Sequence, residues 1–289
     1  MAGSGRGHRR GRTVILVTGA TGNAGGAVVR ALANSGERVR AVVRDVDHAS
    51  LPASVEAAAG DLNQPGTLVP HFDGVTAAFL LSGYEGLEET LANMRHAGVE
   101  RVVLLSSSAA PTGDLTNAVA RYHILSERAV RDSGLGWTFL QPNTFMTNTF
   151  QWLPQLQQGS VIRAPFPDVR VATIDPDDIG AVAAAALTSD ASAGRAYRLS
   201  GPESLSPADR VAILAEVLGR ELRFEGQTDE EARAQMNAAM PAEYVDAFFR
   251  FFVDGDLDES EVLPTVQDVT GRAPRTFEAW ARAHADAFR

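Results

Sequence analysis

Three glycines at a fixed spacing are the first residues whose pattern suggests chemistry. Gly19, Gly22 and Gly25 follow the apolar run 14–17, and a helix-forming stretch, 27–32, comes next. Glycine in such a turn lets the backbone approach a pyrophosphate, which then binds free N–H groups at the positive end of the helix. Glycines also mark ordinary turns, but their place between strand and helix favours a dinucleotide site. The loop residues assigned to this site are Gly19, Thr21, Gly22, Asn23, Ala24 and Gly25.

The next candidate contact is Arg44, at the end of a second expected strand, 38–44. The adenosine ribose of a dinucleotide would lie there, and a guanidinium suits a 2′-phosphate through bidentate hydrogen bonds. The neighbouring Asp45 suits a free 2′-hydroxyl instead, and because adjacent strand residues point to opposite faces only one can take this role. We expect Arg44 to take it, and therefore NADP(H) as the cofactor; a solvated Arg–Asp turn is the remaining alternative.

Residues at the ends of later strands complete the expected cofactor contacts. Asp61 suits an adenine edge, although a plain turn carboxylate fits it equally well. Serines at a strand end are often only turn formers, but here a cluster follows the strand expected beside the nicotinamide, and Ser107 is the catalytic candidate among them. The further cofactor-binding residues assigned in this way are Asp61, Leu62, Leu81, Ser82, Ser106, Pro142 and Asn143.

Composition excludes several familiar mechanisms. The chain has no lysine, which rules out a P-loop lysine, a Schiff-base lysine and a Tyr-x-x-x-Lys pair. Arginine keeps its charge and cannot replace lysine as a base near neutral pH. The absence of cysteine excludes disulfides, thiolate nucleophiles and cysteine metal sites, and it fits a cytoplasmic protein. The histidines show no ligand spacing, so we expect no metal site.

The elements that must position these residues alternate between strand and helix. The runs that predict strands are 14–17, 38–44, 55–62, 74–81, 99–107, 137–142 and 196–200, and the first two of them predict buried strands. Helical patterns separate most of them, as at 87–97, 118–133 and 179–187. We therefore expect an α/β fold, a doubly wound parallel sheet of the Rossmann type with right-handed crossovers. Ligands of such sheets bind beyond the carboxyl ends of the strands.

Segments of different character suggest a division of the chain. Residues 1–12 are basic and Gly-rich and predict a disordered tail, 13–142 carry the NAD(P)-binding Rossmann pattern, and 143–289 form a smaller substrate-side subdomain interleaved with late Rossmann elements. The net charge is −10, which argues against nucleic-acid binding. No apolar run reaches the roughly 20 residues of a membrane span.

The sequence resembles the NmrA-like group of atypical short-chain dehydrogenases/reductases. The similarity lies in the glycine loop 19–25, the strand ends 43–44 and 60–62, the segment 133–142 and the terminal stretch 271–277. It implies a Rossmann fold and NADPH-dependent reduction, because the group includes quinone and azo-dye reductases. The group also includes NADP-sensing regulators that catalyse nothing known.

The resemblance also points to two catalytic candidates on one helix. Tyr122 stands where the short-chain family has its catalytic tyrosine, but Ser126 replaces the lysine that would lower the tyrosine pKa. His123 occupies the position of a histidine in the quinone-reductase-like members, and Glu127, four residues later, could orient its ring. His123 either contacts the cofactor, supplies a proton, or is a helix histidine with a packing role. Gln141 replaces the arginine that the family usually has there.

Aromatic residues after Asn143 suggest a flat apolar pocket, although aromatics at such spacing are often core instead. The residues assigned to the substrate are Tyr84, Phe145, Met146, Phe150 and Trp152. We therefore expect an NADPH-dependent reductase that passes hydride to a quinone, conjugated carbonyl or aromatic ketone. An NADP(H)-sensing regulator and a non-redox isomerase or cyclase are the alternatives. A small aromatic or quinonoid molecule is the expected partner, and a homodimer is kept open.

Overall fold

A sheet of seven parallel strands forms the centre of the computed structural model, which describes residues 13–288. The basic tail expected at 1–12 lies outside the described residues. The strand order is β3-β2-β1-β4-β5-β6-β8, the order of a doubly wound sheet extended by one strand. The strands are β1 (Val14–Val17), β2 (Arg38–Val43), β3 (Glu56–Ala59), β4 (Val75–Leu81), β5 (Arg101–Leu105), β6 (Gly136–Pro142) and β8 (Arg195–Leu199). The α/β Rossmann-type fold predicted from the sequence is confirmed.

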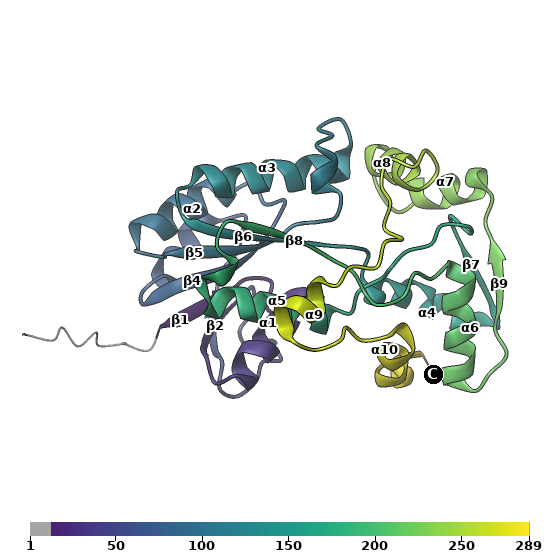
Figure 1. Ribbon diagram of the computed structural model, residues 1–289, viewed down its shortest axis with the longest axis horizontal. Coiled ribbons are helices and arrows are strands. Elements are labelled where there is room, and N and C mark those ends of the chain that lie inside the picture. The colour runs from purple at the N-terminus through teal and green to yellow at the C-terminus, as the bar shows by residue number, and fades with distance from the viewer. Residues whose placement is uncertain (1–12, 289) are drawn as a thin grey trace, which may run out of the picture.

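Helices cover both faces of this sheet (Figure 1). Helices α1 (Asn23–Asn34) and α5 (Pro176–Thr188) lie on one face, and α2 (Leu87–His96) and α3 (Ala118–Asp132) lie on the other. All four residues of β1 are buried, as expected for a strand covered on both sides. Each face therefore has its own apolar core.

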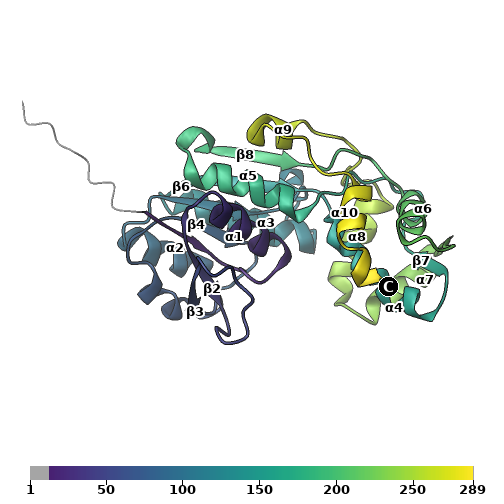
Figure 2. The same ribbon diagram turned by 90° about the horizontal axis from the view of Figure 1, so that it is seen from below.

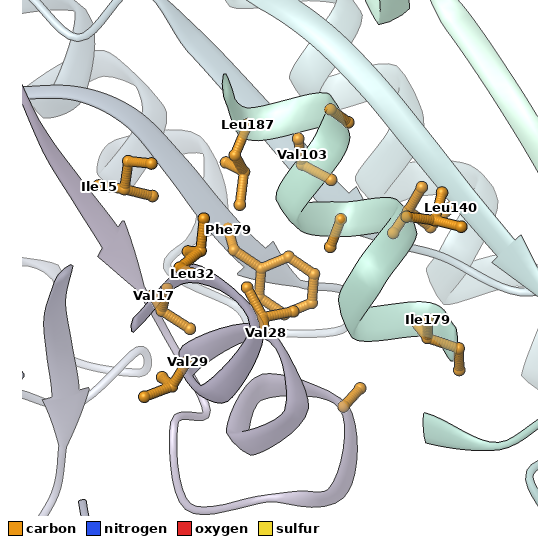
Figure 3. Packing of buried hydrophobic residues seen from close by; sticks show 14 of the residues in the cluster. Ile15, Val17, Val28, Val29, Leu32, Phe79, Val103, Leu140, Ile179 and Leu187 are labelled. Carbon is orange, nitrogen blue, oxygen red and sulfur yellow. The ribbon is translucent and has the colours of Figure 1, made fainter. Parts of the chain in front are cut away.

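The core beneath α1 and α5 holds the cofactor-side elements in place. Figure 3 shows Val28 of α1 beside Phe79 of β4, and Ile179 of α5 belongs to the same cluster; all three side chains are fully buried. The two helices approach closely because Gly180 has no side chain: a Cβ there would lie 2.6 Å from the carbonyl carbon of Ala27. This contact ties the second half of the chain to the first helix.

A second cluster of elements lies beyond the carboxyl ends of the sheet strands (Figure 2). It contains a two-stranded parallel sheet of β7 (Val161–Ala164) and β9 (Arg223–Gly226). Around it pack the 3-10 helix η4 (Met146–Trp152) and the helices α4 (Leu153–Gln158), α6 (Pro207–Leu218), α7 (Asp229–Asn237), α8 (Ala242–Phe252) and α10 (Phe277–Ala283). We refer to these elements as the outer cluster.

Three local features of the chain's second half are not among the elements expected from the sequence. The stretch 161–167 contains β7, whose partner β9 is distant in sequence. The stretch 228–252 contains two helices, because residues 238–241 end α7 and Pro241 precedes α8. The link after α8 contains a further short helix, α9 (Thr265–Thr270), which packs on α5. Within 13–288, no helix is both long and apolar enough to cross a bilayer.

Candidate cofactor and substrate site

The turn between β1 and α1 requires glycine at two positions. Gly19 adopts a φ of 61°, in the left-handed region that favours glycine. A Cβ on Gly25 would lie 2.2 Å from the carbonyl oxygen of Gly19, so any side chain at this position would clash with the backbone. The turn is closed by a 2.9 Å hydrogen bond from the N–H of Gly22 to the same oxygen. The sequence spacing therefore produces a tight backbone turn that leads directly into the helix.

The first turn of α1 is free to receive an anion. Its N-cap residue, Gly22, has no side chain to accept hydrogen bonds from the first N–H groups, and no acidic residue lies in the first turn. By contrast, side chains of Asn117 and Asp175 cap α3 and α5. The free N–H groups of a helix start carry partial positive charge. The residues present therefore fit the pyrophosphate of a dinucleotide.

Asp45 has hydrogen-bond partners within its own turn, whereas Arg44 has none among the described residues. The Asp45 carboxylate accepts hydrogen bonds from the backbone N–H groups of Asp47 and His48, and it lies 2.7 Å from the His48 Nδ1. Arg44 is exposed, and no residue within 13–288 forms an ion pair or side-chain hydrogen bond with it. Asp45 thus stabilises its own turn, and Arg44 is available at this strand end; its contact with a 2′-phosphate stays a prediction.

Of the other residues expected around the cofactor, Asp61 and Leu62 have structural contacts, whereas Leu81 lies beside the glycine turn. Asp61 caps its own turn, because its Oδ1 accepts from the N–H of Asn63, and this supports the turn reading over an adenine contact. Leu62 packs against the core on the α2 face. Leu81 is closer to the expected role, since a Cβ on Gly19 would lie 2.5 Å from its Cδ1. Leu81 also lines a cavity at the strand ends.

This first cavity measures about 370 Å³ and lies at the carboxyl ends of β4, β5 and β6. The predicted site residues that line it are Leu81, Ser82, Ser106, Ser107, Tyr122, His123, Pro142, Asn143 and Phe145. The loop after β5, the helix α3 and the segment after β6 therefore meet at one place, as parallel-sheet topology requires. Phe248, Phe251 and Phe252 of α8 form its apolar wall. Their roles in binding stay predictions, but their proximity is a property of the fold.

Glu127 does not orient His123, contrary to the sequence expectation. Its carboxylate accepts hydrogen bonds from Ser106 Oγ at 2.7 Å and Gln141 Nε2 at 2.8 Å, and it pairs with Arg131 at 3.1 Å. Four residues along a helix place two side chains on one face, but a side chain already satisfied elsewhere does not turn to its neighbour. The same contacts give Gln141 a structural role in place of the family arginine.

His123 is a neutral histidine in an apolar setting. Burial lowers its pKa to about 3, because the protonated ring would lose its hydration. Its Nδ1 is buried and has no hydrogen-bond partner in the described part of the chain. Its ring lies 4.1 Å from that of Tyr122, centroid to centroid. A ring that is neutral at physiological pH can donate or accept a hydrogen bond, but it is no imidazolium acid.

Tyr122 lacks the features of the short-chain family's acid. Burial, and to a smaller extent Tyr244, raises its pKa, whereas the standard mechanism needs it lowered. Ser126, at the lysine position, donates to the Tyr122 carbonyl at 2.7 Å and accepts from the N–H of Gly83 at 3.1 Å. The serine therefore stabilises the loop after β4 and carries no charge that could lower the pKa of the phenol.

Glu259 is a site residue that the sequence analysis missed. It lies in the link after α8, buried at the wall of the first cavity. Its carboxylate accepts from Ser108 Oγ at 2.6 Å and from the Thr144 hydroxyl and N–H at 2.6 and 3.0 Å. Burial raises its pKa, and these hydrogen bonds act against that rise. An acidic residue in a polar link gives no sequence signal for burial.

A second cavity, of about 260 Å³, lies against the first within the outer cluster. Thr144, Asn148, Phe248 and Phe252 line both cavities, so the two share a wall. Among residues 13–288, Phe166 is the one non-glycine residue with a positive φ, at 53°, and it lines the second cavity. Strain of this kind persists where surrounding packing holds it, as it often does around binding sites.

The predicted substrate residues fall in different places. Phe145 lines the first cavity and Trp152 the second. Met146 is buried in the outer-cluster core, and Phe150 stacks on Phe288 in the same core, so packing replaces the expected substrate contact for both. Tyr84 lines neither cavity. Aromatic spacing alone could not separate core from pocket.

A parallel sheet with an open, glycine-lined helix start and a cavity at its strand ends is the architecture of a dinucleotide-binding Rossmann protein. Within that class, the chain belongs to the NmrA-like family, whose model matches residues 11–281. The predicted resemblance is confirmed.

Curated relatives and solved structures match nearly the whole chain. The (4-alkanoyl-5-oxo-2,5-dihydrofuran-3-yl)methyl phosphate reductase of Streptomyces griseus is 39% identical over 280 residues, 95% of this chain and 99% of the relative. The NAD(P)H azoreductase of Xenophilus azovorans is 35% identical over 285 residues, again 95% and 99%. A crystal structure of an NADPH-dependent quinone oxidoreductase from Escherichia coli has a TM-score of 0.77, covering 95% of this chain and 100% of its own, at 21% identity. That likeness shows a shared fold.

Proposed function

We propose that this protein is an NADPH-dependent reductase that transfers hydride to a conjugated carbonyl group of a small molecule. The observation that carries the proposal is the first cavity, because it joins the glycine turn through Leu81 to the residues at the ends of three strands. The oxidoreductase class is supported by both curated relatives, which are named reductases, and the nicotinamide cofactor by the relative that is named for NAD(P)H. Arg44, free of protein partners in the described structure, supports NADPH over NADH.

The carbonyl class follows from one relative and from the chemistry of the site. The Streptomyces griseus reductase is named for a molecule that carries an alkanoyl ketone and a lactone carbonyl on one unsaturated ring. Hydride addition to such a conjugated system, as to a quinone, gives a delocalised anion that needs little acid assistance. This suits a cavity whose histidine is neutral and whose tyrosine has a raised pKa. We therefore place conjugated carbonyl compounds first and quinones second.

In this proposal the chain's own residues bind the cofactor, orient the substrate and exclude water from the cavity. The turn at 19–25 would hold the pyrophosphate of NADPH and Arg44 its 2′-phosphate, and the bound cofactor supplies the hydride. His123 offers a neutral ring nitrogen as a hydrogen-bond partner at the cavity wall. The Phe248, Phe251 and Phe252 rings keep the cavity apolar, which strengthens every polar contact inside it.

The test is a direct assay with purified protein and NADPH. An alkanoyl butenolide, menadione and an azo dye are each added, and the nicotinamide absorbance is followed against samples without protein. Turnover of the butenolide well above the uncatalysed rate is the expected result. NADPH binding without turnover of any acceptor would instead indicate a sensor, and product formation without NADPH consumption would indicate an isomerase or cyclase.

A further inference from the structure

Arg210, in the first part of α6, has an unusual environment. Its side chain lines the second cavity, and its Nε is buried without a hydrogen-bond partner. Within the described residues its side chain forms no ion pair and no hydrogen bond, and it lies over the ring of Trp152, whose centroid is 5.4 Å from the guanidinium carbon. A cation of this kind lacks the partner that buried charges normally have.

Two acidic residues of the outer cluster, one of them next to Arg210 in the sequence, are already paired with other arginines. Asp209, the adjacent residue, pairs with Arg170 at 3.0 Å. Glu231 pairs with Arg163 at 2.9 Å. Burial lowers the Arg210 pKa to about 10, so the guanidinium remains charged at neutral pH. Since the described chain leaves this charge uncompensated, a bound anion would relieve a cost that the free protein carries.

The second cavity has a polar side and an apolar wall. Trp152 Nε1 and Gln227 Oε1 are buried without hydrogen-bond partners in the described structure, and both residues line the cavity with Arg210. Met236, Met240 and the phenylalanines provide apolar surface. Of the described residues that line this cavity, none is acidic, and Arg210 is the one that carries a full charge. Arg210 and the Trp152 N–H are donors that suit one anionic group, Gln227 Oε1 is an acceptor that suits a donor group of the ligand, and the rest of the lining suits its apolar part.

The second cavity is placed to extend the first. Thr144, Asn148, Phe248 and Phe252 belong to both linings, so a molecule whose carbonyl lies in the first cavity could continue past Phe248 into the second. The cavities measure about 370 and 260 Å³, and their combined size is that of a small-molecule site. Arg210 lies in the cavity farther from the cofactor turn.

We propose that Arg210 binds an oxyanion, a phosphate monoester or a carboxylate, that the substrate carries, and thereby holds the substrate's carbonyl group in the first cavity. This proposal rests on the proposed reductase function, since it assigns the substrate's second functional group. Arg210 would be a specificity-determining residue: its fork donates two parallel hydrogen bonds to one oxyanion. Trp152 would contribute its indole N–H at the same end.

The experiment compares three substrates that differ in one group. They are a 4-hexanoyl butenolide with a methyl phosphate at position 3, the same ring with a carboxymethyl group, and the uncharged hydroxymethyl compound. Each is assayed with NADPH and with wild-type, Arg210→Gln and Arg223→Gln proteins. Arg223 is the matched control, because its exposed side chain pairs with Glu225 at 2.7 Å and lines neither cavity.

Wild type should prefer at least one charged substrate over the alcohol by about tenfold or more in kcat/KM. Arg210→Gln should lose that preference through a higher KM and leave the alcohol within about twofold of wild type, while Arg223→Gln changes neither. The charged substrate that loses most identifies phosphate or carboxylate as the group bound. An equal loss on all three substrates, or no preference in wild type, would overturn the proposal.

A failure of the reductase function can be told apart from a failure of the Arg210 site. If no substrate is turned over, binding of the phosphate and alcohol compounds to the protein with NADP⁺ is measured by calorimetry. Heat of binding for the phosphate that disappears in Arg210→Gln and persists in Arg223→Gln supports the anion site without catalysis. Equal binding of the phosphate by wild type and Arg210→Gln contradicts it.

Discussion

Arg44 is the residue whose chemistry decides between the two nicotinamide cofactors. Its partner-free guanidinium, next to an Asp45 that is occupied by its own turn, should contribute a charge-assisted contact to NADPH alone. We expect Arg44→Ala to weaken NADPH binding by about ten- to hundredfold, from the roughly 1.5–3 kcal/mol of such hydrogen bonds. NADH binding should hardly change. Calorimetry with both cofactors checks this, and equal weakening of both would mean that Arg44 acts on the fold.

The lowered pKa of His123 predicts how the free energy of unfolding depends on pH. Its pKa is lowered to about 3 in the folded state against an ordinary 6.5, so the unfolded chain binds the extra proton between these values. Stability should therefore fall as the pH drops below about 6.5, with a slope of up to roughly 1.4 kcal/mol per pH unit from this residue. His123→Leu should flatten the slope in urea unfolding at several pH values. His96→Gln, at an exposed position of α2, should keep the wild-type slope.

At the scale of elements, the glycine turn can be tested by adding a single carbon. In Gly25→Ala the new Cβ would meet the Gly19 carbonyl oxygen at 2.2 Å, so the turn must open and the N–H groups of α1 must shift. NADPH binding should fall at least about tenfold, since positioned backbone donors carry the phosphate contact. In Gly66→Ala the new Cβ would meet nothing within 4 Å, and binding should stay at the wild-type value. Unchanged binding in Gly25→Ala would place the phosphates elsewhere.

The elements also show how far sequence patterns reach. The strands β1, β4, β5 and β6 were predictable because each contains a local apolar run, and the glycine turn because its spacing is local as well. The strands β7 and β9 were not, since they form only by pairing with each other across about sixty residues. The roles of Glu127 and Glu259 were not predictable for the same reason. Glu127 bonds to Ser106 and Gln141, and Glu259 to Ser108 and Thr144. These partners come from other segments of the chain, and no periodic pattern in the sequence encodes such pairs.

At the scale of the whole molecule, the link after α8 fastens the outer cluster to the sheet through Glu259. Its carboxylate receives three hydrogen bonds from the loop after β5 and the segment after β6, and its backbone carbonyl accepts from Asn143 Nδ2 and the Ala172 N–H. Both cavities share Thr144, one of these donors. The geometry of the site thus depends on a side chain contributed from the far end of the chain.

Two substitutions of Glu259 should behave differently. Because burial raises its pKa, the carboxylate is protonated more readily in the folded state, and its contribution to stability falls as the pH rises through that raised pKa. Glu259→Gln keeps an acceptor for Ser108 and the Thr144 N–H and removes the charge, so urea unfolding at neutral pH should show equal or greater stability. Glu259→Ala leaves buried donors unsatisfied and should cost about 2–4 kcal/mol. If Gln destabilises as much as Ala at neutral pH, the ionised carboxylate is itself required to hold the two parts together.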